Sequence, residues 1–215
     1  MFGLGDARIL NLNPLVVVVD NFASPDECAT FMELAEGRLH RAIVGSGAGT
    51  AKVSDRRTGS DSLLRPAKHP ALMPVLMKIA MVMRMPVEHC EGFNVLHYAP
   101  GQEFKPHDDA IGAAVIARNE EKFRIAGGQR LFSTMIYLNE VAGGGATTFP
   151  RLGLEVAPEP GRLLIFSITQ PGSDAPDPLA IHAGEPVTEG EKWAAIGWWH
   201  QAPHQPVVYA FDDNR

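Results

Sequence analysis

Basic residues and cysteine are both scarce in this sequence, and each shortage excludes a class of function. The chain has 19 lysines and arginines against 25 acidic residues, a net charge of −6 at pH 7, and its basic residues form no run. Binding of nucleic acid needs a concentrated positive surface, so we do not expect nucleic acid as a partner. The 2 cysteines, Cys28 and Cys90, have neither metal-binding nor redox spacing, and we expect both to be small buried hydrophobic residues.

The sequence also lacks a long uninterrupted apolar run. The longest candidates are residues 15–19, which are too few, and residues 71–85, which contain Lys78 and Arg84. Neither segment is suited to spanning a bilayer, and we expect no membrane anchor. Residues 1–6 lack the basic start and long apolar stretch of a secretory signal, which predicts a cytoplasmic location.

The composition that is present is that of a globular domain. Apolar residues make up 45% of the 215 residues, and charged residues make up 20%. A chain of this length can bury a sufficient core without disulfide bonds or structural metal ions. We therefore predict one domain over residues 1–215, in which a bound metal ion performs chemistry rather than stabilising the fold.

The N-terminal part of the chain predicts two helices. Ser24 followed by proline and two acidic residues is typical of a helix N-terminus, and we expect helices over residues 25–39 and 71–85. Between them, residues 41–63 are polar and rich in glycine. Residues 45–50 superficially resemble a phosphate-binding loop but lack Gly-Lys-Ser/Thr at the required spacing, so we interpret the whole stretch as an ordinary loop.

Short apolar segments separated by glycine and proline predict strands in the rest of the chain. The expected strands are residues 15–19, 92–98, 131–138, 162–168 and 193–199. This pattern predicts a mainly β fold with flanking helices, a barrel or sandwich braced by the N-terminal helices. We divide the domain into a helical support region over residues 1–90 and a β core over residues 91–203.

A candidate metal site begins with His107 and Asp109. Residues two apart on an extended segment point to the same face, so the imidazole and the carboxylate can reach one ion. A third ligand must come from a distant strand, and His182 is the candidate. Two histidines and one carboxylate leave about three open positions on an octahedral ion, as in nonheme Fe(II) oxygenases. The pair alone is a weak signal, because His-x-Asp also arises by chance on surfaces and in cores.

Lys192 is a lysine at the start of the apolar segment that ends at Trp199. A buried ammonium group needs an anionic partner. That partner is either a carboxylate of the protein or the distal carboxylate of a bound 2-oxo diacid. The hydroxyls of Tyr137 and Thr147, on neighbouring segments, favour the second alternative because they would contribute to the same pocket.

Ordered motifs along the whole chain strengthen this interpretation. They are Arg57-Thr58, Tyr98-x-x-Gly101-Gln102, His107-x-Asp109, Gly128-Gln129-Arg130, Tyr137-Leu138-Asn139, Gly144-Gly145-Ala146-Thr147-x-Phe149-Pro150, Pro160-Gly161, His182-Ala183-Gly184-x-Pro186-Val187 and Gly190-Glu191-Lys192-Trp193. Together they resemble the prolyl 4-hydroxylase branch of the 2-oxoglutarate/Fe(II)-dependent dioxygenases. The resemblance covers about residues 14–200 and implies a double-stranded β-helix, the jelly-roll type of barrel.

The resemblance also implies roles and cofactors. It makes His107, Asp109 and His182 the iron ligands and Lys192 the partner of the distal carboxylate of 2-oxoglutarate. Tyr137 and Thr147 complete the co-substrate pocket, and Tyr98 lies beside the metal. The cofactors implied are Fe(II), 2-oxoglutarate as co-substrate, O2, and ascorbate as a reductant. The reaction implied is hydroxylation of a prolyl residue in a peptide or protein, with release of succinate and CO2.

Substrate recognition is less defined by the sequence. The resemblance places Arg130, Trp198 and His200 near the peptide, although a surface ion pair, a core ring and a strand-end residue are the structural alternatives. Phe104 stands where relatives carry a tyrosine, and Ala110 replaces an aromatic residue. Residues 110–127 border the expected mouth and are predicted to form a lid.

Several alternatives remain open from the sequence. The enzyme alternatives are a hydroxylase of a small molecule or of a non-prolyl side chain, and a zinc or manganese hydrolase, which would leave Lys192 without a purpose. A non-catalytic module that senses iron or 2-oxoglutarate is the binding alternative, and a homodimer through the N-terminal helices is also undecided. We expect Phe166, Trp193 and Trp198 to exclude water from the metal. The remaining histidines are expected to be structural: His40, His69, His89, His97, facing away from Tyr98, and His204.

Overall fold

Two antiparallel sheets form the framework of the protein. A computed structural model describes residues 7–45 and 51–206. The larger sheet has the order β1 (Ala7–Leu12), β2 (Leu15–Val19), β13 (Leu163–Ser167), β9 (Arg130–Tyr137), β16 (Lys192–His200), β7 (Phe93–Tyr98), β6 (Ser60–Leu64) and β3 (His40–Arg41). The smaller sheet has the order β12 (Leu154–Val156), β11 (Thr147–Phe149), β14 (His182–Gly184) and β8 (Phe104–His107). Two short pairs accompany them, β10 (Gly143–Gly144) with β15 (Val187–Glu189) and β4 (Ile43–Gly45) with β5 (Ala51–Val53).

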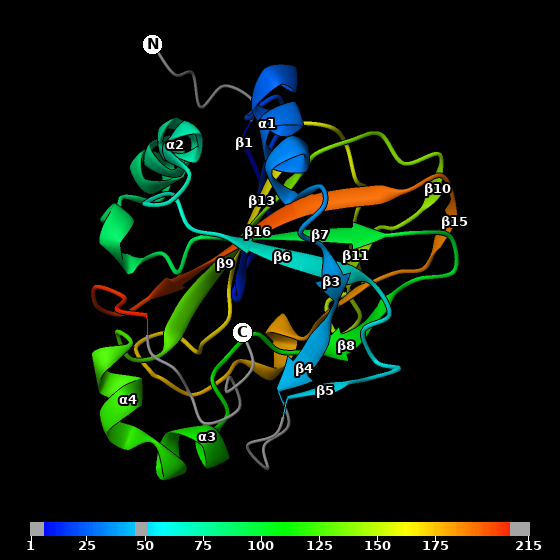
Figure 1. The fold of residues 1–215 in the computed structure, drawn as a ribbon. Coiled ribbons are helices and arrows are strands. Elements are labelled where there is room, and N and C mark those ends of the chain that lie inside the picture. The colour runs from blue at the N-terminus through cyan, green and yellow to red at the C-terminus, as the bar shows by residue number, and fades with distance from the viewer. Residues whose placement is uncertain (1–6, 46–50, 207–215) are drawn as a thin grey trace.

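One apolar core fills the space between the sheets, and a second fills the space under the helices. Phe166 of the larger sheet meets Phe149 of the smaller sheet edge to face, with ring centroids 5.1 Å apart. On the other face, α1 (Pro25–Ala35) and α2 (Met73–Met83) cover the larger sheet, and Phe31 of α1 packs on Phe93 at 4.8 Å. Figure 1 shows the helices on one side of this sheet and β8 on the other.

The start of α1 is the capping box that Ser24 predicts. The Ser24 hydroxyl accepts a hydrogen bond from the Glu27 amide, and the Glu27 carboxylate accepts one from the Ser24 amide. The helix ends at Ala35, short of the predicted residue 39, because Gly37 adopts a positive φ of 73° that a helix does not allow. The α2 helix is also shorter than expected: the residues before it form the 3-10 helix η2 (Pro70–Leu72), and it ends at Met83 because Arg84 adopts a positive φ of 53°.

The prediction of a loop over residues 41–63 is wrong for much of its length. β4, β5 and most of β6 lie in it, and β6 pairs with β7 along its whole length, from Ser60 opposite His97 to Leu64 opposite Phe93. The sequence hides this strand because Asp61 and Ser62, both buried, interrupt its apolar character. Residues 46–50, the centre of the expected loop, lie outside the described residues. The N-terminal region therefore contributes strands as well as helices to the framework.

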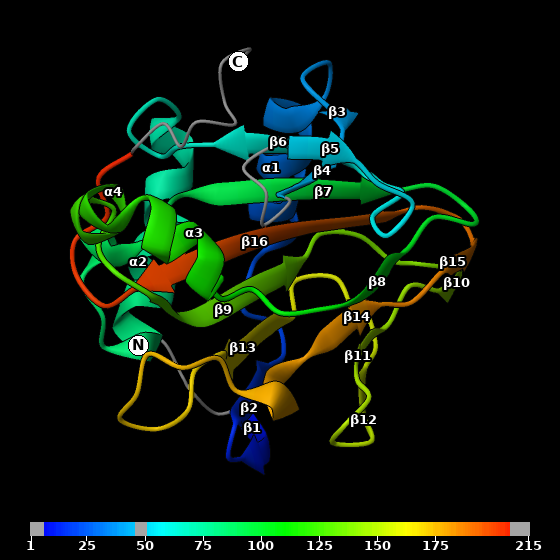
Figure 2. The same cartoon turned by 90° about the horizontal axis from the view of Figure 1, so that it is seen from below.

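The predicted lid consists of two short helices, α3 (Ala113–Arg118) and α4 (Glu120–Ile125), and neither contains a buried residue. Figure 2 shows them at the edge where β9 begins and β16 ends. The Gln129 side chain fastens the start of this segment through hydrogen bonds with both the amide and the carbonyl group of Ile111. Whether the segment moves stays a prediction.

The remaining elements are two 3-10 helices, η3 (Val87–His89) and η4 (Pro178–Ala180). Cys28 is buried and Cys90 is half-buried, and both thiols are free. Among the described helices, none combines the length and the apolar character required to cross a membrane.

Candidate metal and co-substrate site

Strand pairing brings the three predicted metal ligands together. β14 pairs with β8 so that His182 is directly opposite His107, and Asp109 follows β8 after one intervening residue. The Nε2 atom of His107 lies 3.7 Å from Oδ1 of Asp109, and Nε2 of His182 lies 3.6 Å from Oδ2. One ligand atom from each residue lies within 4.8 Å of the others, so one ion can contact all three.

Main-chain carbonyl groups fix both imidazole rings with Nε2 directed at the site. The Nδ1 atom of His107 lies 2.9 Å from the carbonyl oxygen of Lys105, and Nδ1 of His182 lies 3.1 Å from that of Ala180. Each Nδ1 therefore carries the proton, which leaves Nε2 with the lone pair that a metal requires. Nε2 of His182 is buried and has no hydrogen-bond partner among the described residues. An unpaired acceptor of this kind fits a metal ligand.

The electrostatics of the site favour the protonation states that bind metal. Burial, together with the neighbouring His182, holds the pKa of His107 well below its ordinary value, so the ring is neutral. Burial alone would raise the pKa of Asp109, but His182, His107 and the Ser133 hydroxyl outweigh it and hold the pKa below the ordinary value. The site thus presents a neutral imidazole at His107 and a carboxylate at Asp109, which together with the unpaired Nε2 of His182 form the two-histidine, one-carboxylate set preferred by nonheme Fe(II).

Lys192 lies deeper in the same pocket, where it is only 3% exposed. Its Nζ atom is 5.4 Å from the ring centroid of Tyr137 and 6.0 Å from that of Tyr98, its register partner on β7. Among the residues that the structure describes, it forms no ion pair. Burial lowers the pKa of this ammonium group to about 8, and the attraction of the Glu185 carboxylate, which forms no ion pair with it in the described part of the chain, offsets this only in part.

The two predicted hydroxyl groups, those of Tyr137 and Thr147, lie close to Lys192 and to each other. The Tyr137 hydroxyl donates a hydrogen bond of 2.8 Å to Oγ1 of Thr147, and both side chains are buried. Thr147 lines the pocket, whereas Tyr137 supports it from behind. The lining residues are Arg57, Leu96, Tyr98, Phe104, His107, Asp109, Met135, Thr147, His182, Ala183, Gly184, Lys192, Ile196 and Trp198.

Aromatic rings enclose the imidazoles, although not all the rings that the sequence predicts. Phe104 stacks on His107 with centroids 3.5 Å apart, and Phe166 meets His182 at 4.6 Å. Trp198 lines the pocket. The expectation for Trp193 is wrong: its ring packs against His97 at 4.5 Å, because alternation along β16 turns it away from Lys192 and the pocket.

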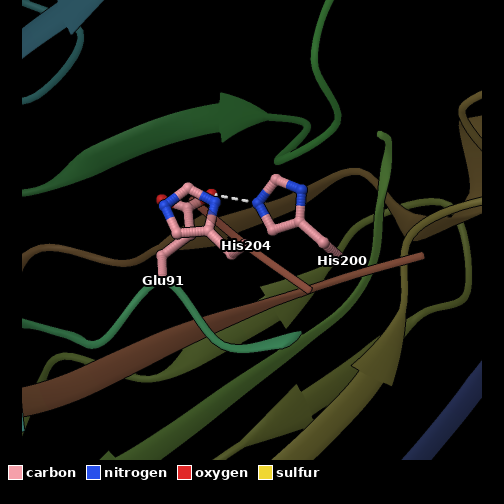
Figure 3. A group of neighbouring side chains, drawn as sticks. All are labelled: Glu91, His200 and His204. Atoms are coloured by element: carbon pink, nitrogen blue, oxygen red, sulfur yellow. Dashed lines mark hydrogen bonds and ion pairs between the residues drawn. The ribbon is translucent and has the colours of Figure 1, made fainter. Parts of the chain in front are cut away.

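A second cluster, Glu91, His200 and His204, lies at the end of β16 (Figure 3). His200 is 1% exposed, and Nε2 of its ring is 2.7 Å from the Glu91 carboxylate. The three could hold a metal by distance, but the Arg130 guanidinium already binds both Glu91 oxygens, at 2.5 and 3.0 Å. Burial would raise the pKa of Glu91, but Arg130 and His200 hold it well below the ordinary value. We interpret the cluster as a buried ionic network.

This network reaches the first site through Arg130. Its guanidinium lies 4.1 Å from the Trp198 ring centroid and donates a hydrogen bond of 3.1 Å to the main-chain carbonyl of Asp109. His200, by contrast, has partners at both ring nitrogens, since Nδ1 lies 2.8 Å from the carbonyl of Gly128. Both nitrogens of the His200 ring are thus bonded within the protein, whereas Trp198 lines the pocket, and contact of either residue with a peptide stays a prediction.

Sequence reasoning missed Glu91, Ser133 and the link between His200 and His204. The spacing of these two histidines, four residues apart, could have indicated that they lie close together, but nothing in the sequence indicates that Glu91 joins them. Each of the other four histidines contacts another part of the protein, as expected of a structural residue. His40 contacts Asp61, His69 contacts Arg38, His89 contacts the carbonyl of His200, and His97 contacts Glu191. His97 does face away from Tyr98, as strand alternation predicts.

Comparison with known proteins agrees with this geometry. Residues 93–200, half of the chain, match the 2OG-Fe(II) oxygenase superfamily. Probable prolyl 4-hydroxylase 3 of Arabidopsis thaliana is 32% identical over 213 residues, which cover 90% of this chain and 71% of the relative.

Two crystal structures share the fold. The viral collagen prolyl hydroxylase of Paramecium bursaria Chlorella virus-1, in its 2OG complex, has a TM-score of 0.64 at 24% identity and covers 85% of this chain and 94% of its own. A prolyl-4-hydroxylase of Pseudomonas putida has a TM-score of 0.55 at 18% identity and covers 86% and 92%.

The fold and the site together define a double-stranded β-helix oxygenase, as the sequence predicts. The chain belongs to the 2OG-Fe(II) oxygenase superfamily and is a prolyl 4-hydroxylase-like member of it. It is accordingly a dioxygenase, for which the family implies Fe(II) and 2-oxoglutarate.

Proposed function

We propose that this enzyme hydroxylates prolyl residues in a peptide or protein, with Fe(II) held by His107, Asp109 and His182. The observation that carries the proposal is the register of β14 on β8, which sets His182 opposite His107 although the two are far apart in the chain. The unpaired Nε2 of His182 and the ionised Asp109 fit the ion. When bound, Fe(II) with 2-oxoglutarate supplies the O2 activation that inserts one oxygen atom and releases succinate and CO2.

Lys192 is proposed to bind the distal carboxylate of 2-oxoglutarate. Its charge is buried and lacks an ion pair among the described residues, so an entering dianion provides the missing partner. Thr147, held by the Tyr137 hydroxyl, lies in the same pocket and offers a hydroxyl to the same end of the ligand. Tyr98, the register partner of Lys192, lines the same pocket as the three metal ligands.

The proline substrate rests on the relatives, which are named prolyl 4-hydroxylases. Two side chains support it, Trp198 in the lining of the pocket and Arg130 beside that ring. Nε1 of Trp198 is buried and without a hydrogen-bond partner in the described part of the chain, so it can donate to a peptide carbonyl group. Arg130 stacks on the same ring and is fixed by Glu91. Within this proposal, His200 supports Arg130 through Glu91.

An omission experiment tests the proposed function. Purified enzyme is supplied with Fe(II), 2-oxoglutarate, O2 and a panel of proline-rich peptides, each component being left out in turn. We expect a gain of one oxygen atom on a prolyl residue only with the complete set, and we expect peptide to raise succinate release above the level reached without it. Turnover of a peptide whose modified residue is not proline would instead favour the hydroxylase of a non-prolyl side chain. Absence of peptide oxidation with retained succinate release would direct the search to small molecules.

A further inference from the structure

Ser133 makes a contact with the metal site that its place in the sequence does not suggest. It lies on β9, is 0% exposed, and its Oγ atom is 2.6 Å from Oδ2 of Asp109. A carboxylate can only accept, so the serine hydroxyl is the donor. The distance is typical of a charge-assisted hydrogen bond, which is stronger than one between neutral groups.

The Asp109 carboxylate lies between the two imidazoles, so the hydrogen bond from Ser133 can affect which of its oxygens binds the metal. Oδ1 lies 3.7 Å from Nε2 of His107, and Oδ2 lies 3.6 Å from Nε2 of His182. The two oxygens are thus placed almost equally relative to the imidazoles, and these distances do not choose one of them as ligand. The Ser133 hydroxyl makes the two oxygens different, because it donates to a lone pair of Oδ2, whereas Oδ1 receives no such hydrogen bond from the residues that the structure describes.

We propose that Ser133 is a positioning residue that orients Asp109 to bind the metal through a single oxygen, Oδ1. The inference rests on the proposed function, in which Asp109 is an iron ligand. A carboxylate that bound through both oxygens would take one of the roughly three positions that two imidazoles and one carboxylate leave open for co-substrate and O2. Ser133 thereby preserves the number of open positions. Arg130 restrains the same residue through its main-chain carbonyl, so the hydroxyl acts on a carboxylate whose backbone is already fixed.

The alternative is that Ser133 only satisfies a buried carboxylate and stabilises the fold. Thr134 provides a matched control for that effect. It is the next residue on β9 and is 1% exposed, and its hydroxyl donates a hydrogen bond of 3.1 Å to the carbonyl of Gly197 and accepts one of 3.1 Å from Nε1 of Trp199. Because neighbouring side chains on a strand point to opposite faces, Thr134 is directed away from the metal site. Thr134→Val removes a buried hydroxyl of the same strand without touching Asp109.

The test measures metal binding, independently of turnover. The dissociation constant for Co(II), a spectroscopic substitute for Fe(II), is determined by calorimetry, and the visible absorption of the bound ion reports its coordination. We expect Ser133→Ala to weaken binding by roughly 10- to 100-fold and to alter the Co(II) spectrum, as loss of an outer hydrogen bond to a ligand usually does. Ser133→Thr retains the hydroxyl and should restore both the affinity and the spectrum. Thr134→Val should change neither.

Thermal melts of each variant show whether a loss of metal binding is due to unfolding. If Ser133→Ala does not fold, Ser133→Cys replaces it, because cysteine is close in size to serine but is a weak hydrogen-bond donor. Unchanged affinity and spectrum in Ser133→Ala, or equal loss in Thr134→Val, would overturn the role of Ser133. His182→Ala is the reference for the site itself. If His182→Ala still binds Co(II), the proposed iron site is wrong. If His182→Ala loses Co(II) binding but Ser133→Ala binds it as the unaltered protein does, only the role of Ser133 is wrong.

Discussion

Lys192 brings a positive charge into a part of the pocket lined by rings and aliphatic carbon. Because burial lowers its pKa to about 8, the group is a cation below that pH and neutral above it. Binding of the 2-oxoglutarate dianion requires the charged form. We therefore expect the affinity for 2-oxoglutarate to be constant below about pH 8 and to fall by roughly tenfold for each pH unit above it, as proton uptake becomes coupled to binding.

Calorimetric titration with 2-oxoglutarate between neutral and alkaline pH checks this expectation. Lys192→Met should weaken binding by roughly 10- to 150-fold at neutral pH, the equivalent of one charge-assisted contact, and should abolish the pH dependence. Lys105→Met, which removes a half-exposed lysine close in sequence to His107, is the control and should leave both unchanged. A pH dependence that persists without Lys192 would assign it to another group.

Trp198 and Trp193 stand on the same strand but face opposite ways, which makes them a matched pair. Trp198 lines the pocket, so Trp198→Ala should reduce peptide hydroxylation more than the peptide-independent decarboxylation of 2-oxoglutarate. Trp193→Ala should leave the ratio of the two activities unchanged, because its ring packs on His97. Succinate and hydroxylated peptide measured in parallel give this ratio. If Trp198→Ala reduced peptide hydroxylation and 2-oxoglutarate decarboxylation equally, the role of the Trp198 ring would be structural.

The individual residues differ in how far the sequence reveals them. His107 and Asp109 were predictable because two ligands share one short segment, and His182 and Lys192 because their motifs lie close together. Ser133 and Glu91 carry no such signal. A lone serine in an apolar strand is ordinary, and its partner Asp109 is joined to it only by the pairing of distant segments. Local patterns cannot show a contact that tertiary structure creates.

Helix α1 offers a test of how local signals stabilise the fold. Its capping box satisfies two amide groups, and Lys78 of α2 bonds the same Glu27 carboxylate at 2.7 Å. Ser24→Ala should lower the free energy of unfolding by about 1 kcal/mol. In a chain of this size, that corresponds to a decrease of about 2–4 °C in Tm.

Calorimetric melts of the unaltered protein and of two variants check the cap. Ser24→Asp retains a side-chain acceptor at the cap and should remain close to the unaltered protein. Metal affinity should not change in either variant, because α1 and β8, the strand that ends at His107, lie on opposite sides of the larger sheet (Figure 1). A loss of metal binding in Ser24→Ala would show that the helix supports the site as well as the fold.

The elements themselves were predicted unevenly, and periodicity explains the difference. The strands β2, β7, β9, β13 and β16 consist largely of apolar residues bounded by turns, and all five lie where the sequence places them. β6 was missed because buried Asp61 looks like a loop residue. In the structure, the Asp61 carboxylate forms an ion pair with Arg57 at 3.0 Å and accepts a hydrogen bond from Asn94 at 3.1 Å. Neither partner can be predicted from the sequence.

We expect the molecule as a whole to fold without a bound metal ion. Two extensive apolar clusters, one between the sheets and one under the helices, are built without any contribution from His107 or Asp109. Treatment with a chelator should therefore leave the β-sheet circular dichroism unchanged. Binding of metal to the folded state alone should raise stability by about 2.7 kcal/mol when free metal is a hundredfold above its dissociation constant.

Melts with and without added metal measure this difference, and His182→Ala supplies the control, because its melting temperature should not respond to the ion. An apo protein with the spectrum of an unfolded chain would make the ion structural and would contradict the prediction drawn from chain length. The physical reason to expect a folded apo state is that His107 and His182 sit on strands already fixed by sheet pairing, and Asp109 follows two residues after His107. The ion then meets a preformed site, and its binding energy remains available to hold co-substrate and substrate in place.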